Sequence, residues 1–332
     1  MIELFRAAQG IGSDISEERN GESMNGRKTK LISFALAAIL SVAMLGTEAN
    51  AATAGQNEDE ISISEARGRN ERALSLKTVI TKNVSYYASR SLYVQGKRIS
   101  TPARIINGEE YISLKAVSES IGASYSYSSS QRTATVRMSG LLLTAGDACY
   151  TSYANDRPQF SMTPNLFMSD GGLYIPARVF AKVTGLSLRT GSGAIYLSGN
   201  LRPLKSAGSF YRSDEVFWLA RIIQAESAGE PLIGKIAVGN VVLNRVRSSS
   251  YPNTIYGVIF DRKYGVQFSP VLDGSIYNTP SYNATLAAKI CLEGFDLSEG
   301  ALFFLRPEMS SSSWIPNNRP YIFSIGKHDF YK

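Results

Sequence analysis

The stretch from Ser213 to Arg247 constrains the fold more than any other part of the chain, because it sets an acidic residue on an apolar helix face. Apolar side chains recur there at helical spacing, at Val216, Leu219, Ile222 and Ile223. Glu226 follows Leu219 by seven positions and Ile223 by three, so it continues the same stripe. A carboxylate has no packing role on such a face, which indicates a functional site on a helix.

The ends of this helix can be predicted from its flanking residues. Ser213 is a suitable N-cap, and Gly229 and Pro231 end the helix just beyond Glu226. Glu226 would then lie half-buried in the last turn, where desolvation next to a helix C-terminus raises the pKa of a carboxyl group. A general acid that works near neutral pH needs such a pKa. The alternative interpretation is an exposed glutamate at a helix end.

A second helix is predicted over about 233–247, with apolar residues on most of its faces. Asn240, Asn244 and Arg247 form a polar row along it at positions i, i+4 and i+7. The row is either the solvent face or the floor of a cleft. A helix that is buried on its other faces has little need of two amides, which favours the cleft.

The C-terminal part of the chain carries four ordered motifs: AESAGEPLIGKIAVGNVVLNRV, PNTIYGVIFDRKYGVQFSPV, EGALFFLRP and IGKHDFYK. Together they resemble the SleB/CwlJ-type cell wall hydrolases, the spore-cortex lytic enzyme family, over 213–332. The resemblance implies a small lysozyme-like α+β catalytic domain that cleaves the glycan strands of peptidoglycan, with Glu226 as the catalytic acid/base. One departure is Arg306 in Phe304–Pro307, where the family has an aromatic-Asn-Pro sequence. It leaves the details of that cleft wall open.

Further candidates share this domain with Glu226. Glu230, in the same motif, is the second candidate for the acid. Gln267 and Phe268, together with Trp314 and Tyr321, offer amide and aromatic surfaces of the kind that bind sugar rings, although each alone is more often structural. The residues predicted to bind substrate are Glu230, Asn244, Gln267, Phe268, Trp314 and His328.

The chain has a single histidine, His328, and this excludes several classes of hydrolase. Zinc peptidases and amidases need at least two histidine ligands or a cysteine cluster, so neither a metal site nor any cofactor is expected. A Cys/His peptidase would have to pair His328 with Cys149 or Cys291, and neither cysteine has a motif around it. The residues alone favour a hydrogen-bonded core histidine, whereas the resemblance favours a cleft residue that orients substrate.

The two cysteines fall in different predicted domains. Cys291 lies on the alanine stripe of a helix that is predicted to begin with Thr279 as cap and Pro280 at its first position. It is most simply a small buried apolar residue. A disulfide with Cys149 between the domains is the alternative.

The number of carboxylates near the motifs bears on the reaction type. Hydrolytic glycosidases place two carboxylates across the scissile bond, but Asp261, Asp273 and Glu299 lie in loop-like sequence with no apolar surroundings. One acid suffices if the 6-hydroxyl of muramic acid is the nucleophile. The family resemblance also points to a lytic transglycosylase that forms 1,6-anhydromuramyl ends. Alternatives are a muramidase, with Asp273 as the second carboxylate, and a non-catalytic wall-binding protein.

The N-terminal 51 residues have the pattern of an export signal. A basic segment at 24–30 precedes the apolar run Leu31–Leu45, and Ala49–Ala51 forms an A-x-A cleavage site. We predict translation from Met24, cleavage after Ala51, and a secreted, cell-wall-associated protein. The apolar run is shorter than the roughly 20 residues of a spanning helix, so no stable membrane span is expected after cleavage.

Residues 52–90 are predicted to be a linker, polar up to about residue 78, and a strand-rich α+β domain is predicted over 91–200. This domain contains an internal repeat at an offset of 63: Tyr111–Val117 matches Tyr174–Phe180, and Gly122 matches Gly185. It resembles the copper amine oxidase N-terminal-like domain, a stalk module. Oxidase chemistry needs several histidines, so a spacer or wall-binding role is expected instead.

The charge balance is basic, with 35 Lys and Arg against 28 Asp and Glu. Such a surplus suits an anionic partner. The sequence has no basic helix, zinc knuckle or RNP-like strand, so nucleic acid is not expected. An acidic cell-wall polymer, beside the peptidoglycan strands themselves, agrees better with the export signal.

Overall fold

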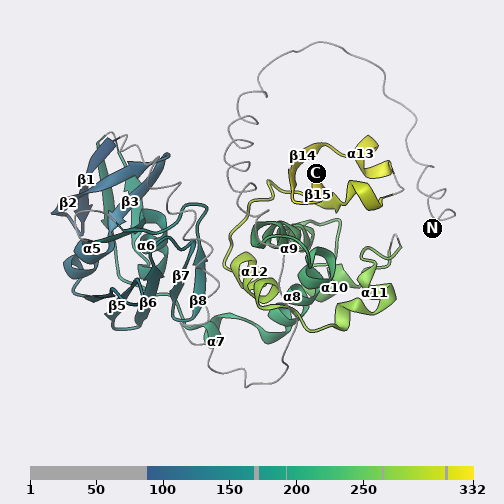
Figure 1. Cartoon of the computed structure of the whole chain (residues 1–332), viewed down its shortest axis with the longest axis horizontal. Helices are drawn as coiled ribbons and strands as arrows, with labels where there is room; N and C mark the ends of the chain where they lie inside the picture. The colour runs from purple at the N-terminus through teal and green to yellow at the C-terminus, as the bar shows by residue number, and fades with distance from the viewer. Residues whose placement is uncertain (1–87, 168–171, 192, 264, 311–312) are drawn as a thin grey trace, which may run out of the picture. The chain divides into compact units, whose positions relative to one another are not determined.

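The computed structural model describes residues 88–167, 172–191, 193–263, 265–310 and 313–332 (Figure 1). The predicted signal segment, its cleavage site and the linker as far as residue 87 lie outside the described residues. Two compact units account for the rest. The first consists of 88–216 with 288–295, and the second of 217–287 with 296–332.

The first unit is built on two sheets. Its seven-stranded sheet has the order β11-β12-β1-β2-β3-β10-β9, and its five-stranded sheet has the order β4-β5-β6-β7-β8. Neighbouring strands are antiparallel except for β1 and β12. The elements are β1 (Ala88–Val94), β2 (Lys97–Ile106), β3 (Glu109–Ser113), α5 (Leu114–Ser120), β4 (Ser124–Ser128), β5 (Thr133–Met138), β6 (Leu141–Gly146), β7 (Thr151–Ala154), β8 (Arg157–Phe160), β9 (Leu166–Phe167), β10 (Leu173–Pro176), α6 (Ala177–Thr184), β11 (Ser187–Thr190), β12 (Ala194–Ser198) and α7 (Ala207–Phe210).

The sequence repeat appears as a local two-fold relation in this unit. Each copy runs strand, helix, glycine, strand, turn, strand, as predicted, and Gly122 and Gly185 share a φ of +77° after their helices. Strands β3 and β10 pair antiparallel with Ile112 opposite Ile175. These two residues are 63 positions apart, so equivalent residues of the two copies face each other and a two-fold axis passes between them.

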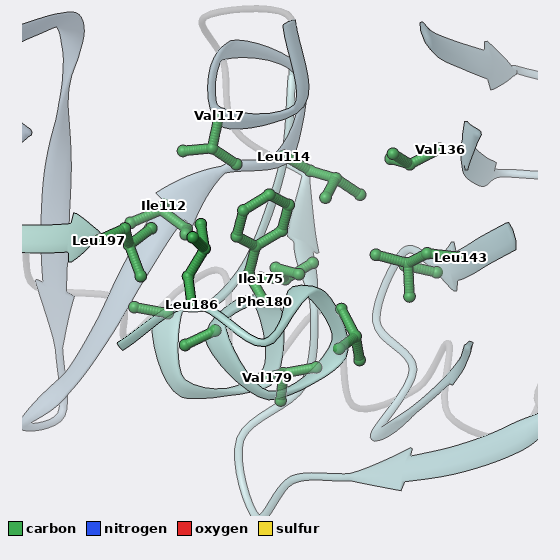
Figure 2. Close-up of a cluster of buried hydrophobic side chains, with 14 of the residues drawn as sticks. Ile112, Leu114, Val117, Val136, Leu143, Ile175, Val179, Phe180, Leu186 and Leu197 are labelled. Carbon is green, nitrogen blue, oxygen red and sulfur yellow. The ribbon is translucent and has the colours of Figure 1, made fainter. Parts of the chain in front are cut away.

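The core of the first unit lies between the sheets and the two longer helices. Phe180 of α6 is fully buried among side chains of both repeat copies, as Figure 2 shows. The neighbouring strands alternate buried and partly exposed residues, as in β5 and β6, so each sheet turns one apolar face inward. The prediction of a strand-rich α+β domain is confirmed.

The second unit combines helices with a small sheet of order β13-β15-β14. The central helix α9 contacts α10, β13 and β14. The elements are α8 (Ser213–Ser227), α9 (Leu232–Arg247), α10 (Ile255–Ile259), α11 (Pro270–Asp273), η3 (Ser275–Tyr277), α12 (Tyr282–Leu292), β13 (Phe303–Leu305), η4 (Pro307–Met309), α13 (Trp314–Asn318), β14 (Tyr321–Ile325) and β15 (His328–Tyr331).

The helix predictions in this unit are correct to within a few residues. Helix α8 begins at Ser213 itself rather than after it as a cap, and α9 begins one residue early. Helix α12 begins at Tyr282, and the Ser281 hydroxyl accepts the Ala284 N–H at 3.2 Å, so Ser281 rather than Thr279 caps it. Cys291 is buried on α12, and Cys149 and Cys291 are not joined by a disulfide.

No helix within the described part of the chain is long and apolar enough to cross a membrane.

Candidate active site

Glu226 lies in the last turn of α8, on the helix face whose other members, Leu219, Ile222 and Ile223, are fully buried. Burial raises the pKa of its carboxyl group to about 7, from 4.5. The positive charge of Arg245 opposes this shift, and the negative charge of Asp273 adds to it. Among the residues that the structure describes, none forms a hydrogen bond with the Glu226 side chain. This is the environment of a carboxyl group that can both give and take a proton near neutral pH.

Arg245 is the charged residue that faces Glu226 from α9. It is only 5% exposed, and its Nε donates to the Leu302 carbonyl at 2.8 Å. Three rings surround the guanidinium, with centroids 5.1 Å (Tyr251), 5.1 Å (Phe268) and 5.6 Å (Phe303) from its central carbon. Arg245 was not among the residues predicted from the sequence, although the pattern that identified Glu226 is present there too. Arg245 also continues an apolar stripe, after Val238, Val241 and Val242.

Lys235 fixes the end of the helix that carries Glu226. Its buried ammonium group donates to the carbonyls of Ser227 at 2.6 Å, Ala228 at 2.8 Å and Glu230 at 2.6 Å. These carbonyls follow the last turn of α8, where backbone acceptors have no partner within the helix. Lys235 therefore satisfies them and limits the freedom of the backbone directly after Glu226.

Glu230 contacts the turn between β14 and β15. Its two carboxylate oxygens accept the Lys327 N–H at 3.3 and 3.2 Å, and one of them lies 3.4 Å from His328 Nδ1. The Glu230 and His328 side chains are 6% and 7% exposed. Burial lowers the pKa of His328, with the Arg306 charge acting in the same direction and Glu230 opposing it. Both residues were predicted to bind substrate. The structure brings them together, but it uses the Glu230 carboxylate inside the domain.

The polar row on α9 is divided between two environments, because Asn240 and Asn244 are buried whereas Arg247 is exposed. The Asn240 carbonyl oxygen accepts the Leu297 N–H at 3.1 Å. The Asn244 amide donates to Ser298 Oγ at 2.7 Å and to the Ala301 carbonyl at 3.0 Å. The two buried amides hold the loop 297–301 because that loop offers the donors and acceptors which the helix lacks. Asn244 therefore has a structural contact where substrate binding was expected.

Two other predicted substrate-binding residues are committed to internal contacts. Phe268 is 2% exposed, and its ring lies beside the ring of Phe304 and the guanidinium of Arg245. The faces of the ring are therefore covered and cannot stack on a sugar. Gln267 is half-buried, and its amide donates to the Gly265 carbonyl at 3.1 Å.

Trp314 and Tyr321 keep more of their surface. Trp314 is half-buried and contacts Phe303, at a centroid distance of 6.4 Å, and Arg319. Phe303 in turn lies beside Arg245. Tyr321 is exposed on the edge strand β14, and its hydroxyl is 2.8 Å from Ser324 Oγ.

Asp273, at the end of α11, is the other carboxylate that acts on Glu226. It is exposed and accepts the Ser275 N–H at 2.8 Å, and this hydrogen bonding lowers its pKa. It therefore stays ionised where Glu226 holds its proton. Within the described ranges, no group of three or more His, Cys, Asp or Glu residues could hold a metal ion. The chemistry that the arrangement offers is proton transfer by one half-buried acid, Glu226.

Family models match both parts of the chain. Residues 229–331 match the model described as Cell Wall Hydrolase, and residues 93–194 match that of the Copper amine oxidase N-terminal domain. The first match begins at Gly229, three residues after Glu226.

Similar curated proteins are spore cortex-lytic enzymes. That of Bacillus cereus is 42% identical over 122 residues, which are 37% of this chain and 46% of that enzyme. That of Halalkalibacterium halodurans is 37% identical over 131 residues, 40% of this chain and 38% of that enzyme. The chain thus spans less than half the length of these relatives.

A solved structure also matches, the catalytic domain of the germination-specific lytic transglycosylase SleB from Bacillus anthracis. Its sequence is 42% identical to this chain over the aligned residues. The alignment covers 97% of that domain and 37% of this chain, with a TM-score of 0.34. The chain therefore carries a region that matches the Cell Wall Hydrolase model, preceded by one that matches the copper amine oxidase N-terminal domain, and part of its length is similar to spore cortex-lytic enzymes.

Proposed function

We propose that the protein cleaves the glycan strands of peptidoglycan between N-acetylmuramic acid and N-acetylglucosamine. One observation carries this proposal: three residues before the region that matches the Cell Wall Hydrolase model, the carboxyl group of Glu226 on an apolar helix face has its pKa raised to about 7. Catalytic acids need such a pKa to work near neutral pH. The spore cortex-lytic enzymes among the relatives support the same substrate class.

The reaction is proposed to be lytic transglycosylation. The Glu226 carboxyl donates its proton to the glycosidic oxygen as the bond from that oxygen to C1 of muramic acid breaks. The 6-hydroxyl oxygen of the same sugar then bonds to C1, and its proton passes to the Glu226 carboxylate. The products are a free 4-hydroxyl on one strand and a 1,6-anhydromuramyl end on the other. No water is consumed, and Glu226 returns to its protonated form.

Hydrolysis by a muramidase mechanism is the second candidate, because Asp273 is an ionised carboxylate whose charge acts on Glu226. Hydrolytic glycosidases use a second carboxylate in this way, as base or nucleophile. In that case the products would be reducing muramic ends, and Asp273→Asn would abolish activity.

Digestion of purified sacculi and spore cortex, followed by mass spectrometry of the released fragments, tests these proposals. We expect soluble fragments with 1,6-anhydromuramyl ends. Reducing ends without anhydro product would reject transglycosylation in favour of hydrolysis. Release of no fragments from either wall type, by a correctly folded protein, would leave a non-catalytic wall-binding role and contradict the proposed activity.

The domain over 91–200 is proposed to hold the hydrolase domain, 213–332, at the wall after export and removal of residues 1–51. The basic charge balance supports contact with an anionic wall polymer. A second binding contact raises the effective concentration of an enzyme at an insoluble polymer but not at short fragments. Sedimentation of the protein with sacculi, with and without teichoic acid, measures this contact. Equal binding to both preparations would exclude the anionic polymer.

A further inference from the structure

Arg245 is a buried charge of the second unit that has no part in the proposed reaction so far. Its Nη1 is buried and has no hydrogen-bond partner. In the part of the chain that the structure describes, no carboxylate oxygen lies within ion-pair distance of it. Its single hydrogen bond, from Nε to the Leu302 carbonyl, leaves most of the guanidinium against the rings of Tyr251, Phe268 and Phe303.

This arrangement is unfavourable for folding alone. A guanidinium remains charged at any physiological pH and has five N–H donors, so its burial without a partner costs free energy. The rest of the stripe on α9 is formed by valines, and an apolar residue at 245 would pack there without that cost. The contacts with three rings offset part of the penalty. The remainder indicates a role for the positive charge itself.

The carboxyl group that this charge reaches is that of Glu226. Arg245 is the only positive charge that acts on Glu226 among the causes of its shifted pKa, and Glu226 in turn acts on Arg245. The remaining charged and titratable groups around the pair are Asp273 from α11, which faces Glu226, and Tyr251 and Asp261 from the loops on either side of α10, which face Arg245.

We propose that Arg245 is a positioning residue for Glu226: its fixed buried charge sets how readily Glu226 releases its proton and stabilises the carboxylate that remains after the leaving oxygen has been protonated. The inference rests on the proposed function of Glu226. Arginine cannot take the proton itself, so the two roles stay separate. Without Arg245, desolvation would act unopposed, and Glu226 would hold its proton too tightly to protonate a leaving group.

The sign of the effect on pH dependence follows from these contacts. Arg245 lowers the pKa of Glu226, so its removal raises that pKa above about 7. Activity that requires protonated Glu226 declines on the alkaline side as the proton is lost. A neutral residue at 245 should therefore move this decline to higher pH, by about one unit for the loss of one nearby opposite charge, and should lower the maximal rate.

The test uses full-length protein with Arg245→Gln and Arg245→Lys, and Arg247→Gln as the control on the same helix. Arg247 is 57% exposed and pairs with Asp296 at 3.6 Å. Two measurements are made: the pH profile of fragment release from sacculi, and the titration of the Glu226 carboxyl carbon by NMR, assigned with Glu226→Gln. We expect Arg245→Gln to raise the titration midpoint by about one unit, with Arg245→Lys and Arg247→Gln close to the unmodified protein.

A purely structural role predicts a different result, in which Arg245→Gln and Arg245→Lys lose activity alike and the midpoint of Glu226 stays in place. That outcome would overturn the inference. If Arg245→Gln does not fold, Arg245→Lys provides the test. Lysine keeps the positive charge, so a Glu226 titration midpoint displaced by a full unit in Arg245→Lys would also overturn the inference. The two proposals fail separately: activity retained by Glu226→Gln would reject the proposed function, whereas an unmoved midpoint in an active protein would reject only the role of Arg245.

Discussion

Each unit sets a glutamate near an arginine, Glu293 buried and Glu226 half-buried, and the two pairs are built in opposite ways. In the first unit Arg157 and Glu293 form a bidentate pair at 2.7 and 2.9 Å, and the Tyr211 hydroxyl and Lys182 also donate to Glu293. In the second unit Glu226 and Arg245 act on each other's charge without a hydrogen bond between them.

The pKa values of the two glutamates show the consequence. Burial alone would raise the pKa of Glu293, but the hydrogen bonds of Arg157 and Tyr211 and the charge of Lys182 lower it overall. Burial raises the pKa of Glu226 to about 7, because none of the residues that the structure describes donates a hydrogen bond to it. Hydrogen bonding therefore decides whether a buried carboxyl group is a fixed anion that holds structure or a proton donor.

Of the variants that test this difference, Glu226→Gln should have the largest effect, a loss of activity. The amide keeps the shape of the side chain and loses the proton, so fragment release from sacculi should fall by about 10²–10⁴-fold while the protein stays folded. Glu215→Gln, on the first turn of the same helix, serves as the control and should remain active. Activity above a few per cent in Glu226→Gln would remove Glu226 from the role of acid.

Glu293→Gln should affect stability instead. It leaves the Arg157 guanidinium buried beside a neutral amide, and breaking a buried ion pair in this way costs about 3–5 kcal/mol of the free energy of unfolding. Urea denaturation followed by circular dichroism measures the loss. Asp214→Asn, which breaks the exposed pair with Arg212, should leave the midpoint unchanged. A similar midpoint for both variants would show that burial of the Arg157–Glu293 pair is not important.

The pH dependence of stability should separate the two glutamates further. The folded-state pKa of Glu226, about 7, lies above its unfolded value of 4.5, so its contribution to stability is present below pH 4.5 and is lost as the pH rises through 7. The Glu226→Gln variant has no carboxyl group to ionise at this position, so it does not lose this stability as the pH rises. Above pH 7 its free energy of unfolding should exceed that of the unmodified protein by about 2–3 kcal/mol. Unfolding at pH 4 and pH 8 measures it, and equal stability of the two proteins at pH 8 would contradict the shifted pKa.

Gly326→Ala should give the smallest change in stability. It acts on Glu230, the glutamate that contacts the turn between β14 and β15. A Cβ at Gly326 would overlap Glu230 Oε2, at a φ of +58°. Gly274→Ala is the matched control, because it has a φ of +81° and open space around the Cβ. Backbone strain costs each variant of the order of 1 kcal/mol, and the clash with Glu230 should make Gly326→Ala the less stable of the two. Thermal denaturation compares them, and equal midpoints would show that the turn moves away from Glu230 at little cost.

Periodicity predicted the elements and the acid, but not the partners of the buried polar residues. The spacing of Leu219 and Ile223 placed Glu226 on a helix face correctly, and the repeat predicted two equivalent halves of the first domain. Helical spacing tells which residues share a stripe, but not what covers it. Asn240 and Asn244 were therefore assigned to a cleft, although loop 297–301 covers them.

Contacts between distant parts of the chain could not be predicted from helical spacing, for the same reason. His328 and Glu230 are 98 positions apart, and no local pattern in the sequence links them. Arg245 could have been found, since a basic residue on a stripe of valines is as unusual as an acid among leucine and isoleucine. Its role still depends on Leu302, Phe268 and Phe303, which the chain supplies from two other segments.

The pairing of Ile112 with Ile175 has a consequence for how the first domain could be assembled. Because equivalent residues meet across the two-fold axis, the edge that β3 offers to β10 is the edge that β10 offers to β3. Such a contact is isologous, the kind that joins identical subunits in a dimer. Around this axis β3 and β10 are therefore paired as the equivalent strands of a symmetric dimer would be, although both belong to one polypeptide.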